Sequence, residues 1–307
     1  MRGLGTMKKQ DGILLESGTN ELEIVEFEMG HNRYGINVIK VKEIILPTPI
    51  TVIPHAHPAI EGIMQLRGEV LPVINMEKVM GLPQTIGPND GKYIVAAFNK
   101  QEVVFHVHEV TQIHRISWNH IEKPSDLYSG DASQVIGVIK RERDMLLLLD
   151  FEKIVMEINP DSGIRVEEVQ KLGERERSDK RIVVAEDSPM LRKLLSDTLS
   201  EAGYVNIEFF ENGKDALNFL EAIVADGKTV TDEIQLVITD IEMPQMDGHH
   251  FTKRIRENKD LSALPVIIFS SLITDELKHK GESVGANDQV SKPEIAELVL
   301  KMDQYIL

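Results

Sequence analysis

The chain of 307 residues contains no cysteine, and only 5% of its residues are aromatic. The absence of cysteine excludes disulfides and thiolate metal sites, and cytoplasmic residence is the simplest expectation for such a chain. No apolar run approaches the roughly 20 residues that a membrane helix needs, and residues 1–12 lack the apolar core of a signal peptide. We therefore expect no direct insertion into a membrane.

Positive charge is also scarce, because 34 Lys and Arg face 50 Asp and Glu, which gives a net charge of −16. A nucleic-acid-binding surface needs a clustered excess of Lys and Arg, so we expect no nucleic-acid partner. The hydrophobic content of 42% is enough for real cores. The length suggests about two domains of ordinary size.

Short strand-like segments fill the chain before about residue 160. Apolar or alternating stretches such as Ile24 to Met29, Val70 to Ile74 and Tyr93 to Phe98 are separated by Asn and Gly. This spacing is typical of β-barrels rather than of a parallel sheet. Residues 159–180 are polar and charged, which predicts a linker.

After the linker the period of the apolar residues changes. Ser188-Pro189 is a good helix start, and Gly203 is a good helix stop. Five βα units imply an α/β, doubly wound parallel sheet. The predicted strands are 181–186, 206–210, 235–240, 265–270 and 287–291, and the predicted later helices are 213–225, 248–257, 274–284 and 294–305.

Four of these strands end in residues of complementary chemistry: Glu186-Asp187, Asp240, Ser270 and Lys292. The C-terminal ends of parallel strands meet at one edge of a sheet, where open α/β folds build their sites. Two acids, a nucleophilic carboxylate, a hydroxyl and a lysine are what magnesium-assisted phosphoryl transfer to an aspartate requires.

The roles follow from the ligand preferences of Mg²⁺, a hard cation that binds oxygen. Asp187 and Asp240 suit direct ligation, Glu186 suits ligation through water, and the backbone carbonyl of Glu242 completes the set. Lys292 offers a point charge to a phosphoryl oxygen, and Ser270 offers a hydroxyl donor. Each residue alone is better explained as a solvated polar residue at a strand end, and only the combination favours a site.

Residues 181–307 resemble the response-regulator receiver domain, the family of CheY. The resemblance implies that Asp240 takes phosphate from a phosphohistidine of a sensor kinase and that Ser270 then moves toward it. Where the family often has a switch aromatic, this chain has Gln289. The matching segments are Glu186-Asp187-Ser188, Thr239 to Gly248, Ser270-Ser271 and Lys292-Pro293.

The enzyme alternative is a phosphohydrolase of the haloacid-dehalogenase type. Such enzymes carry a second Asp two residues after the nucleophile, where this chain has Glu242, and usually place the nucleophile on the first strand. Asp240 instead ends the third strand of its predicted domain. We therefore expect no enzyme with an external product, but a domain that assists only its own phosphorylation and dephosphorylation.

Residues 20–158 resemble CheW, a chemotaxis coupling protein built from two five-stranded barrels, and residues 1–19 form an N-terminal extension. The matching segments are Tyr34 to Ile44 and Gln65 to Ile74. The resemblance implies that Val41, Glu43 and Arg67 contact chemoreceptors or the kinase. Val41 as barrel core and Arg67 as a turn-stabilising residue are the structural alternatives.

Structural roles explain the histidines and the single tryptophan. His106 and His108 alternate with Val103, Phe105 and Val107, which predicts that both are solvent-exposed rather than metal ligands. The pair His55-x-His57 lacks an identifiable third ligand. His249-His250 opens a predicted helix and is expected on its surface, and Trp118 is expected in a partial core.

A CheW-like module followed by a receiver is the architecture of the CheV family, and this likeness covers nearly the whole chain. It implies a cytoplasmic chemotaxis adaptor that joins membrane chemoreceptors and the CheA histidine kinase in arrays, with Mg²⁺ as cofactor and Asp240 as the regulating phosphorylation site. A constitutive receptor–kinase scaffold whose receiver acts only as a phosphate sink is the alternative.

Overall fold

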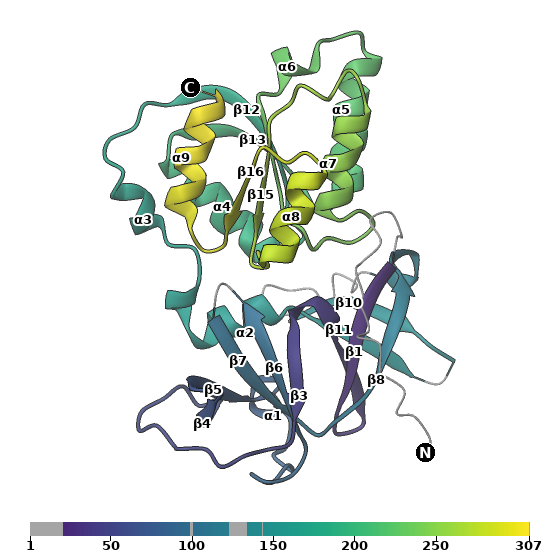
Figure 1. Cartoon of the computed structure of the whole chain (residues 1–307), viewed down its shortest axis with the longest axis vertical. Coiled ribbons are helices and arrows are strands. Elements are labelled where there is room, and N and C mark those ends of the chain that lie inside the picture. Colours follow the sequence, from purple (N-terminus) through teal and green to yellow (C-terminus); the bar gives the residue numbers. More distant parts are fainter. Residues whose placement is uncertain (1–20, 99–100, 123–133, 143, 307) are drawn as a thin grey trace, which may run out of the picture.

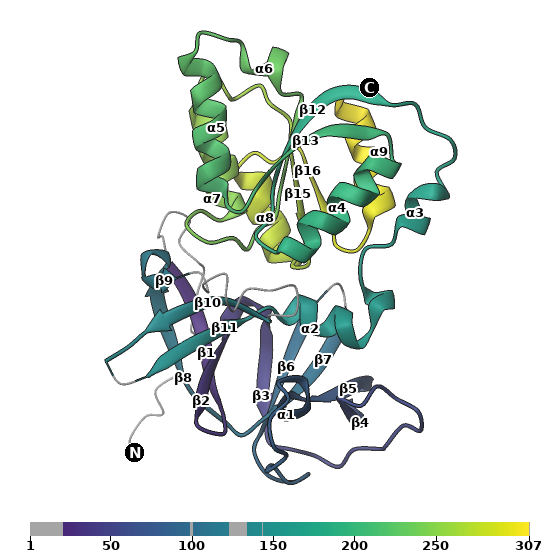
Figure 2. The same ribbon diagram turned by 180° about the vertical axis from the view of Figure 1, so that it is seen from behind.

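The computed structural model describes residues 21–98, 101–122, 134–142 and 144–306. The predicted extension 1–19 lies outside these ranges. Figures 1 and 2 show a β-rich N-terminal half and an α/β C-terminal half stacked along the long axis of the molecule. Among the helices of the described ranges, none is both long and apolar enough to cross a membrane.

In the N-terminal half, the described residues form two β-sheets. The first has the strand order β8-β1-β2-β11-β10-β9 and the second β3-β6-β7-β5-β4, so the chain leaves the first sheet after β2 and returns to it at β8. The short strand β9 is the sixth in the first sheet. The strands are β1 (Glu21–Met29), β2 (Asn32–Asn37), β3 (Val41–Ile45), β4 (Ile60–Leu66), β5 (Glu69–Asn75), β6 (Lys92–Phe98), β7 (Gln101–Val107), β8 (Glu109–Ser117), β9 (Ile121–Glu122), β10 (Val135–Lys140) and β11 (Met145–Leu149).

Helix α2 (Phe151–Ile158) follows the last of these strands and is anchored by its first residue. The Phe151 ring is buried, with centroid distances of 4.8 Å to Phe105 and 6.1 Å to Phe27, which come from different sheets. Asp150 caps the helix by accepting the Lys153 N–H at 3.0 Å. The start of α2 is therefore fixed at the end of the N-terminal half that faces the C-terminal half (Figure 1). The shorter helices here are η1 (Val38–Lys40), α1 (Met76–Val79) and η2 (Trp118–His120).

The C-terminal half contains one parallel sheet with the order β13-β12-β14-β15-β16. This architecture confirms the predicted fold class, in which an all-β half precedes a doubly wound α/β half. The strands are β12 (Ser178–Ala185), β13 (Tyr204–Phe210), β14 (Leu236–Thr239), β15 (Val266–Ser270) and β16 (Asp288–Ser291). The helices are α4 (Pro189–Glu201), α5 (Gly213–Ala225), α6 (Val230–Glu233), α7 (Gly248–Glu257), α8 (Asp275–Ser283) and α9 (Ile295–Ile306).

Alternation along β12 explains how both faces of this sheet are covered. Ile182 and Val184 belong to the apolar core that includes α4 and α9, whereas Val183 and Ala185 belong to the core that includes α5 and α7. Figure 2 shows these two helix layers on opposite sides of the strands. The sheet is therefore buried on both faces, and polar chemistry is placed at the ends of its strands.

The connection between the halves is more structured than its composition predicts. Residues 159–180 contain η3 (Pro160–Ser162), α3 (Val166–Gln170) and the first residues of β12. Ile164 and Val169 are buried in the same core as α4 and α9. Two apolar residues in a charged segment are enough to pack it onto the sheet domain, so the connection is not a free tether.

Candidate functional site

Parallel pairing brings the predicted strand-end residues to one edge of the sheet. Ala185 pairs with Thr239, and Ser270 pairs with Ser291, so the residues that follow emerge side by side. The backbone confirms this arrangement, since the Asp240 N–H donates to the Ala185 carbonyl at 2.9 Å and the Lys292 N–H donates to the Ser270 carbonyl at 2.9 Å. The edge faces the N-terminal half (Figure 1).

Lys292 joins two of the acids in the centre of this site. Its Nζ lies 2.9 Å from Asp240 Oδ2 and 2.7 Å from Glu186 Oε2. Lys292 is only 1% exposed and Asp240 only 4%. The carboxylates Asp240 and Glu186 raise the pKa of the Lys292 ammonium well above its ordinary value, against the opposing effect of burial, and the lysine is therefore charged.

Three carboxylates of the site fit a divalent cation. One oxygen each of Glu186, Asp187 and Asp240 lies within 4.8 Å of the others. Burial, and after it the charge of Glu186, raises the pKa of Asp187 well above its usual range. Clustered, desolvated carboxylate oxygens of this kind suit Mg²⁺, which relieves their repulsion when bound. The predicted ligation by the Glu242 carbonyl stays a prediction.

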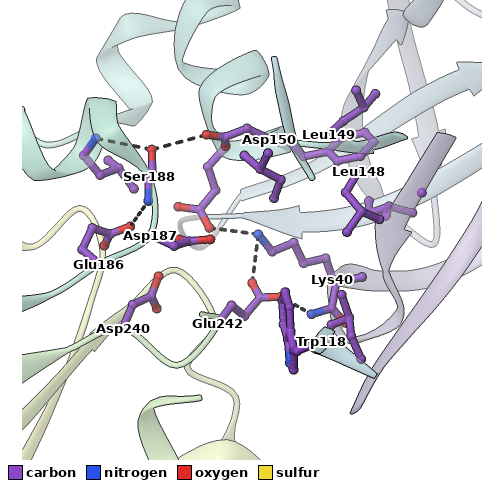
Figure 3. A pocket seen from close by; sticks show the side chains of 18 residues that line it. Lys40, Trp118, Leu148, Leu149, Asp150, Glu186, Asp187, Ser188, Asp240 and Glu242 are labelled. Atoms are coloured by element: carbon purple, nitrogen blue, oxygen red, sulfur yellow. Dashed lines mark hydrogen bonds and ion pairs between the residues drawn. The ribbon is translucent and has the colours of Figure 1, made fainter. Parts of the chain in front are cut away.

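The Glu242 side chain points toward the N-terminal half. Its Oε2 lies 2.9 Å from Lys40 Nζ, and its Oε1 accepts a hydrogen bond from the Asn37 side-chain amide. Burial outweighs the nearby Lys40 and raises the pKa of Glu242 to about 7. Lys40, seen beside Glu242 in Figure 3, and Asn37 therefore hold this carboxylate from the opposite domain.

The two adjacent serines of the site have different partners. The Ser270 hydroxyl is completely buried and accepts the Leu272 N–H at 3.4 Å. The Ser271 hydroxyl instead donates to Glu152 Oε1 of α2 at 2.7 Å. Gln289, at the position where an aromatic is common, donates its side-chain N–H to the Lys278 carbonyl at 2.7 Å.

Residues of the N-terminal half complete the site, and sequence reasoning did not anticipate them. Asp150, Glu152, Asn37 and Lys40 line a cavity of about 60 Å³ together with Asp187 and the other acids of the sheet edge. Figure 3 shows both sets of side chains facing one another. Spacing along the chain carries no signal for such a contact, because the partners lie in different domains.

The three predicted coupling positions lie at the second sheet of the N-terminal half. The Arg67 guanidinium is 78% exposed and lies 3.0 Å from Glu43 Oε2. Arg67 has a φ of 51°, in keeping with its place in the β4–β5 turn. Val41 is half-buried against the main core of this half. The structure thus brings Arg67 and Glu43 together and gives Val41 a packing contact.

Two histidine predictions were wrong. His106 was expected in solvent but is buried, because Glu61 Oε2 at 2.9 Å and the Asp90 carbonyl at 2.8 Å provide partners for its ring. His249 was expected on a helix surface but is 1% exposed. Trp118 does pack partly against a small apolar cluster of the first sheet, as predicted. The metal cluster that the described residues form contains no histidine.

Comparison with known proteins assigns both halves of the chain. The model of the CheW-like domain matches residues 23–159, and the model of the response regulator receiver domain matches residues 182–303. The CheW protein of Thermotoga maritima is 29% identical over 49% of this chain and 98% of its own length. Each half is therefore similar to a separate chemotaxis or signalling module.

Some of the similar proteins match across both modules. The chemotaxis protein CheV3 of Helicobacter pylori is 30% identical over 87% of this chain and 89% of its own length. CheV1 of the same organism is 24% identical over 94% of both chains. With a CheW-like domain followed by a receiver and this similarity over both, the chain belongs to the CheV family of chemotaxis proteins.

Proposed function

We propose that this chain is a chemotaxis adaptor regulated by phosphorylation. In this proposal residues 20–158 couple methyl-accepting chemoreceptors to a CheA-type histidine kinase, and residues 181–307 accept a phosphoryl group on Asp240. Membership of the CheV family supports the adaptor role. The chain would work in the cytoplasm at receptor arrays.

The proposed phosphorylation of Asp240 is supported best by the position of the Lys292 ammonium, which lies between Asp240 and Glu186. In the transfer, the P–N bond of a phosphohistidine breaks as a bond forms between phosphorus and an Asp240 carboxylate oxygen. The imidazole keeps the electron pair and takes up a proton. Lys292 is placed to donate a hydrogen bond to a phosphoryl oxygen and to balance its negative charge. Bound Mg²⁺ would neutralise part of the same charge.

The switch residue in this proposal is Ser270, whose hydroxyl lies at the same sheet edge as Asp240. The buried Ser270 hydroxyl has one weak partner, at 3.4 Å. A phosphoryl oxygen on Asp240 is a stronger, charged acceptor, so the hydroxyl gains by turning toward it. The chain would have no external product, because the phosphoryl group is later lost from Asp240 to water.

Labelling tests this function directly. Phosphorylated CheA-type kinase with Mg²⁺ should label the wild-type chain and leave Asp240→Ala unlabelled, because the acceptor oxygen is gone. Removal of Mg²⁺ with EDTA should abolish the label. A wild-type chain that takes no label from the kinase or from acetyl phosphate would contradict the proposal.

A constitutive scaffold that only drains phosphate is the other candidate. The contact between the phosphorylation site and the N-terminal half favours regulation, since Ser188 beside the acidic pair donates its hydroxyl to Asp150 at 3.3 Å. Kinase activity in receptor arrays discriminates the two. Phosphodonor should change that activity with the wild type and not with Asp240→Ala, whereas equal activities would establish the constitutive scaffold.

A further inference from the structure

Lys40 is a cation of the N-terminal half that lies within the phosphorylation site of the other half. Its Nζ is 3.0 Å from Glu152 Oε1 of its own domain and 2.9 Å from Glu242 Oε2 of the receiver. Its side chain is largely buried, at 14% exposure. Burial opposes the charge of Lys40, but Glu242 and Glu152 raise its pKa well above the ordinary value. Lys40 thus forms a charged bridge between the domains.

Two further contacts extend this bridge on either side. The Asn37 amide donates to the second oxygen of Glu242, two residues from Asp240 along the chain. The Glu152 carboxylate accepts from the Ser271 hydroxyl at 2.7 Å, and its other oxygen lies 4.0 Å from Lys292 Nζ. The bridge therefore contacts Glu242, two residues after the acceptor Asp240, and Ser271, which follows the switch serine. It also lies close to the catalytic lysine, Lys292.

The contact leaves little room for a donor. The cavity between the domains has a volume of about 60 Å³, and it is lined by Asp240 and Glu242 on one side and by Asn37, Lys40 and Glu152 on the other. Such a volume corresponds to a few water molecules, at roughly 10–15 Å³ each on this measure. A phosphohistidine arrives with the protein domain that carries it and cannot reach Asp240, which is 4% exposed, while the two halves are in contact. A free donor such as acetyl phosphate needs a much smaller opening.

The charges at the site also set the contact between the two halves against a phosphoryl group on Asp240. A phosphate on a side chain carries about −1.5 to −2 charges and accepts strong hydrogen bonds. On Asp240 it would repel the Glu152 carboxylate of the N-terminal half and draw away Lys292, whose Nζ lies 4.0 Å from Glu152 Oε2. The ion pairs that hold the domains together and the phosphorylated state therefore disfavour each other.

We infer that Asn37, Lys40 and Glu152 form a docking surface of the N-terminal half for the unphosphorylated receiver of the same chain. This closed contact shields Asp240 from protein phosphodonors, and phosphorylation releases it. The inference rests on the proposed phosphorylation of Asp240. It adds a gate to that reaction, since the docking surface must separate from the receiver before a kinase domain can reach the acceptor.

The test compares a protein donor with a small donor on the full-length chain. Lys40→Ala should accelerate transfer from the phosphohistidine domain of a CheA-type kinase by about tenfold, the factor that loss of about 1.4 kcal/mol of contact energy gives. The rate with acetyl phosphate should change far less, because a free small donor needs a much smaller opening than a protein domain. Lys42→Ala is the matched control, since Lys42 pairs with Glu102 within the N-terminal half.

Glu152→Gln provides a second variant, because it removes a charge from the contact while keeping the length of the side chain. It should also accelerate the protein donor selectively, while Lys42→Ala matches the wild type. Equal rates for wild type, Lys40→Ala and Glu152→Gln with the protein donor would overturn the gate but leave the proposed function intact. Absence of any label on the wild type from both donors would instead overturn the proposed function itself.

Discussion

At the scale of single residues, Lys292 is the counter-charge on which the buried acids depend. It bonds both Asp240 and Glu186, and all three side chains are almost fully buried. Removing one partner from a buried ion pair is costly because the remaining charge keeps its desolvation penalty. The same lysine is therefore expected to matter for stability as well as for phosphoryl transfer.

Lys292→Ala should lower the unfolding free energy of the receiver by about 3 kcal/mol in EDTA, because two carboxylates lose their buried cation. Saturating Mg²⁺ should recover part of this loss, since an ion that binds only the folded state stabilises it. Thermal unfolding with and without Mg²⁺ measures both effects. An unchanged midpoint in EDTA would contradict the assigned role.

His249 gives a pH prediction of defined sign. Burial lowers its pKa from 6.5 to about 4, partly offset by Asp247, so the unfolded chain binds the proton more tightly. The stability contributed by neutral His249 is present above pH 6.5 and is lost as pH falls toward 4. Between pH 8 and pH 5 the loss is about 2 kcal/mol.

His249→Phe should remove this part of the acid sensitivity of the receiver, because phenylalanine does not titrate. His250→Phe, one residue further along α7, is the matched control and should retain the wild-type difference between pH 8 and pH 5. Unfolding followed by circular dichroism provides the measurement. Identical pH dependence in wild type and His249→Phe would refute the assignment.

At the scale of elements, the start of α7 packs closely against the strand end that carries Asp240, the proposed acceptor. A Cβ on Gly248 would lie 1.9 Å from the Asp240 carbonyl oxygen, and the Gly248 N–H bonds the Ile241 carbonyl at 2.9 Å. Backbone cannot move aside as a side-chain end can. Glycine is therefore needed here for close approach rather than for an uncommon φ.

Gly248→Ala should destabilise the receiver by about 1–3 kcal/mol and reduce labelling of Asp240, because the acceptor backbone must shift. Gly281→Ala in α8 is the control, since its Cβ would meet only the side-chain end of Gln289, which can rotate. Denaturant unfolding and labelling of both variants check this. Equal stabilities of the two variants would contradict the argument.

Arg67 and Glu43 form an exposed pair, which contributes at most about 1 kcal/mol to stability. Arg67→Glu should therefore leave folding and Asp240 labelling unchanged while weakening assembly with receptor fragments and kinase. Lys171→Glu, at another exposed pair, is the control. Unaltered assembly in a pull-down would remove Arg67 from the proposed coupling surface.

The helices show which parts of the fold local sequence patterns can predict. Helices 213–225 and 248–257 are found with the predicted bounds, because Asn212 and Asp247 cap them and the apolar period is regular. Helix α3 was not predicted, because its only buried residue is Val169. The burial of His106 was missed for a related reason: its partner Glu61 is far away in the sequence.

At the scale of the whole molecule, the contact between the halves was beyond sequence reasoning. Lys40 and Glu152 are ordinary charged residues in their own segments, and only the fold places them opposite Glu242 and Ser271. The strand-end site was predictable, because parallel strands impose their own geometry. Its partner surface was not, because no local rule relates residues of two domains.

The central claim is that phosphorylation of Asp240 separates the two halves. Because the chain has no cysteine, dyes can be attached to cysteines introduced at His31 and Lys259, both of which are exposed. Energy transfer between the dyes should fall when phosphodonor and Mg²⁺ are added, and it should stay constant in the same chain carrying Asp240→Ala. Unchanged transfer in a fully phosphorylated chain would contradict the account.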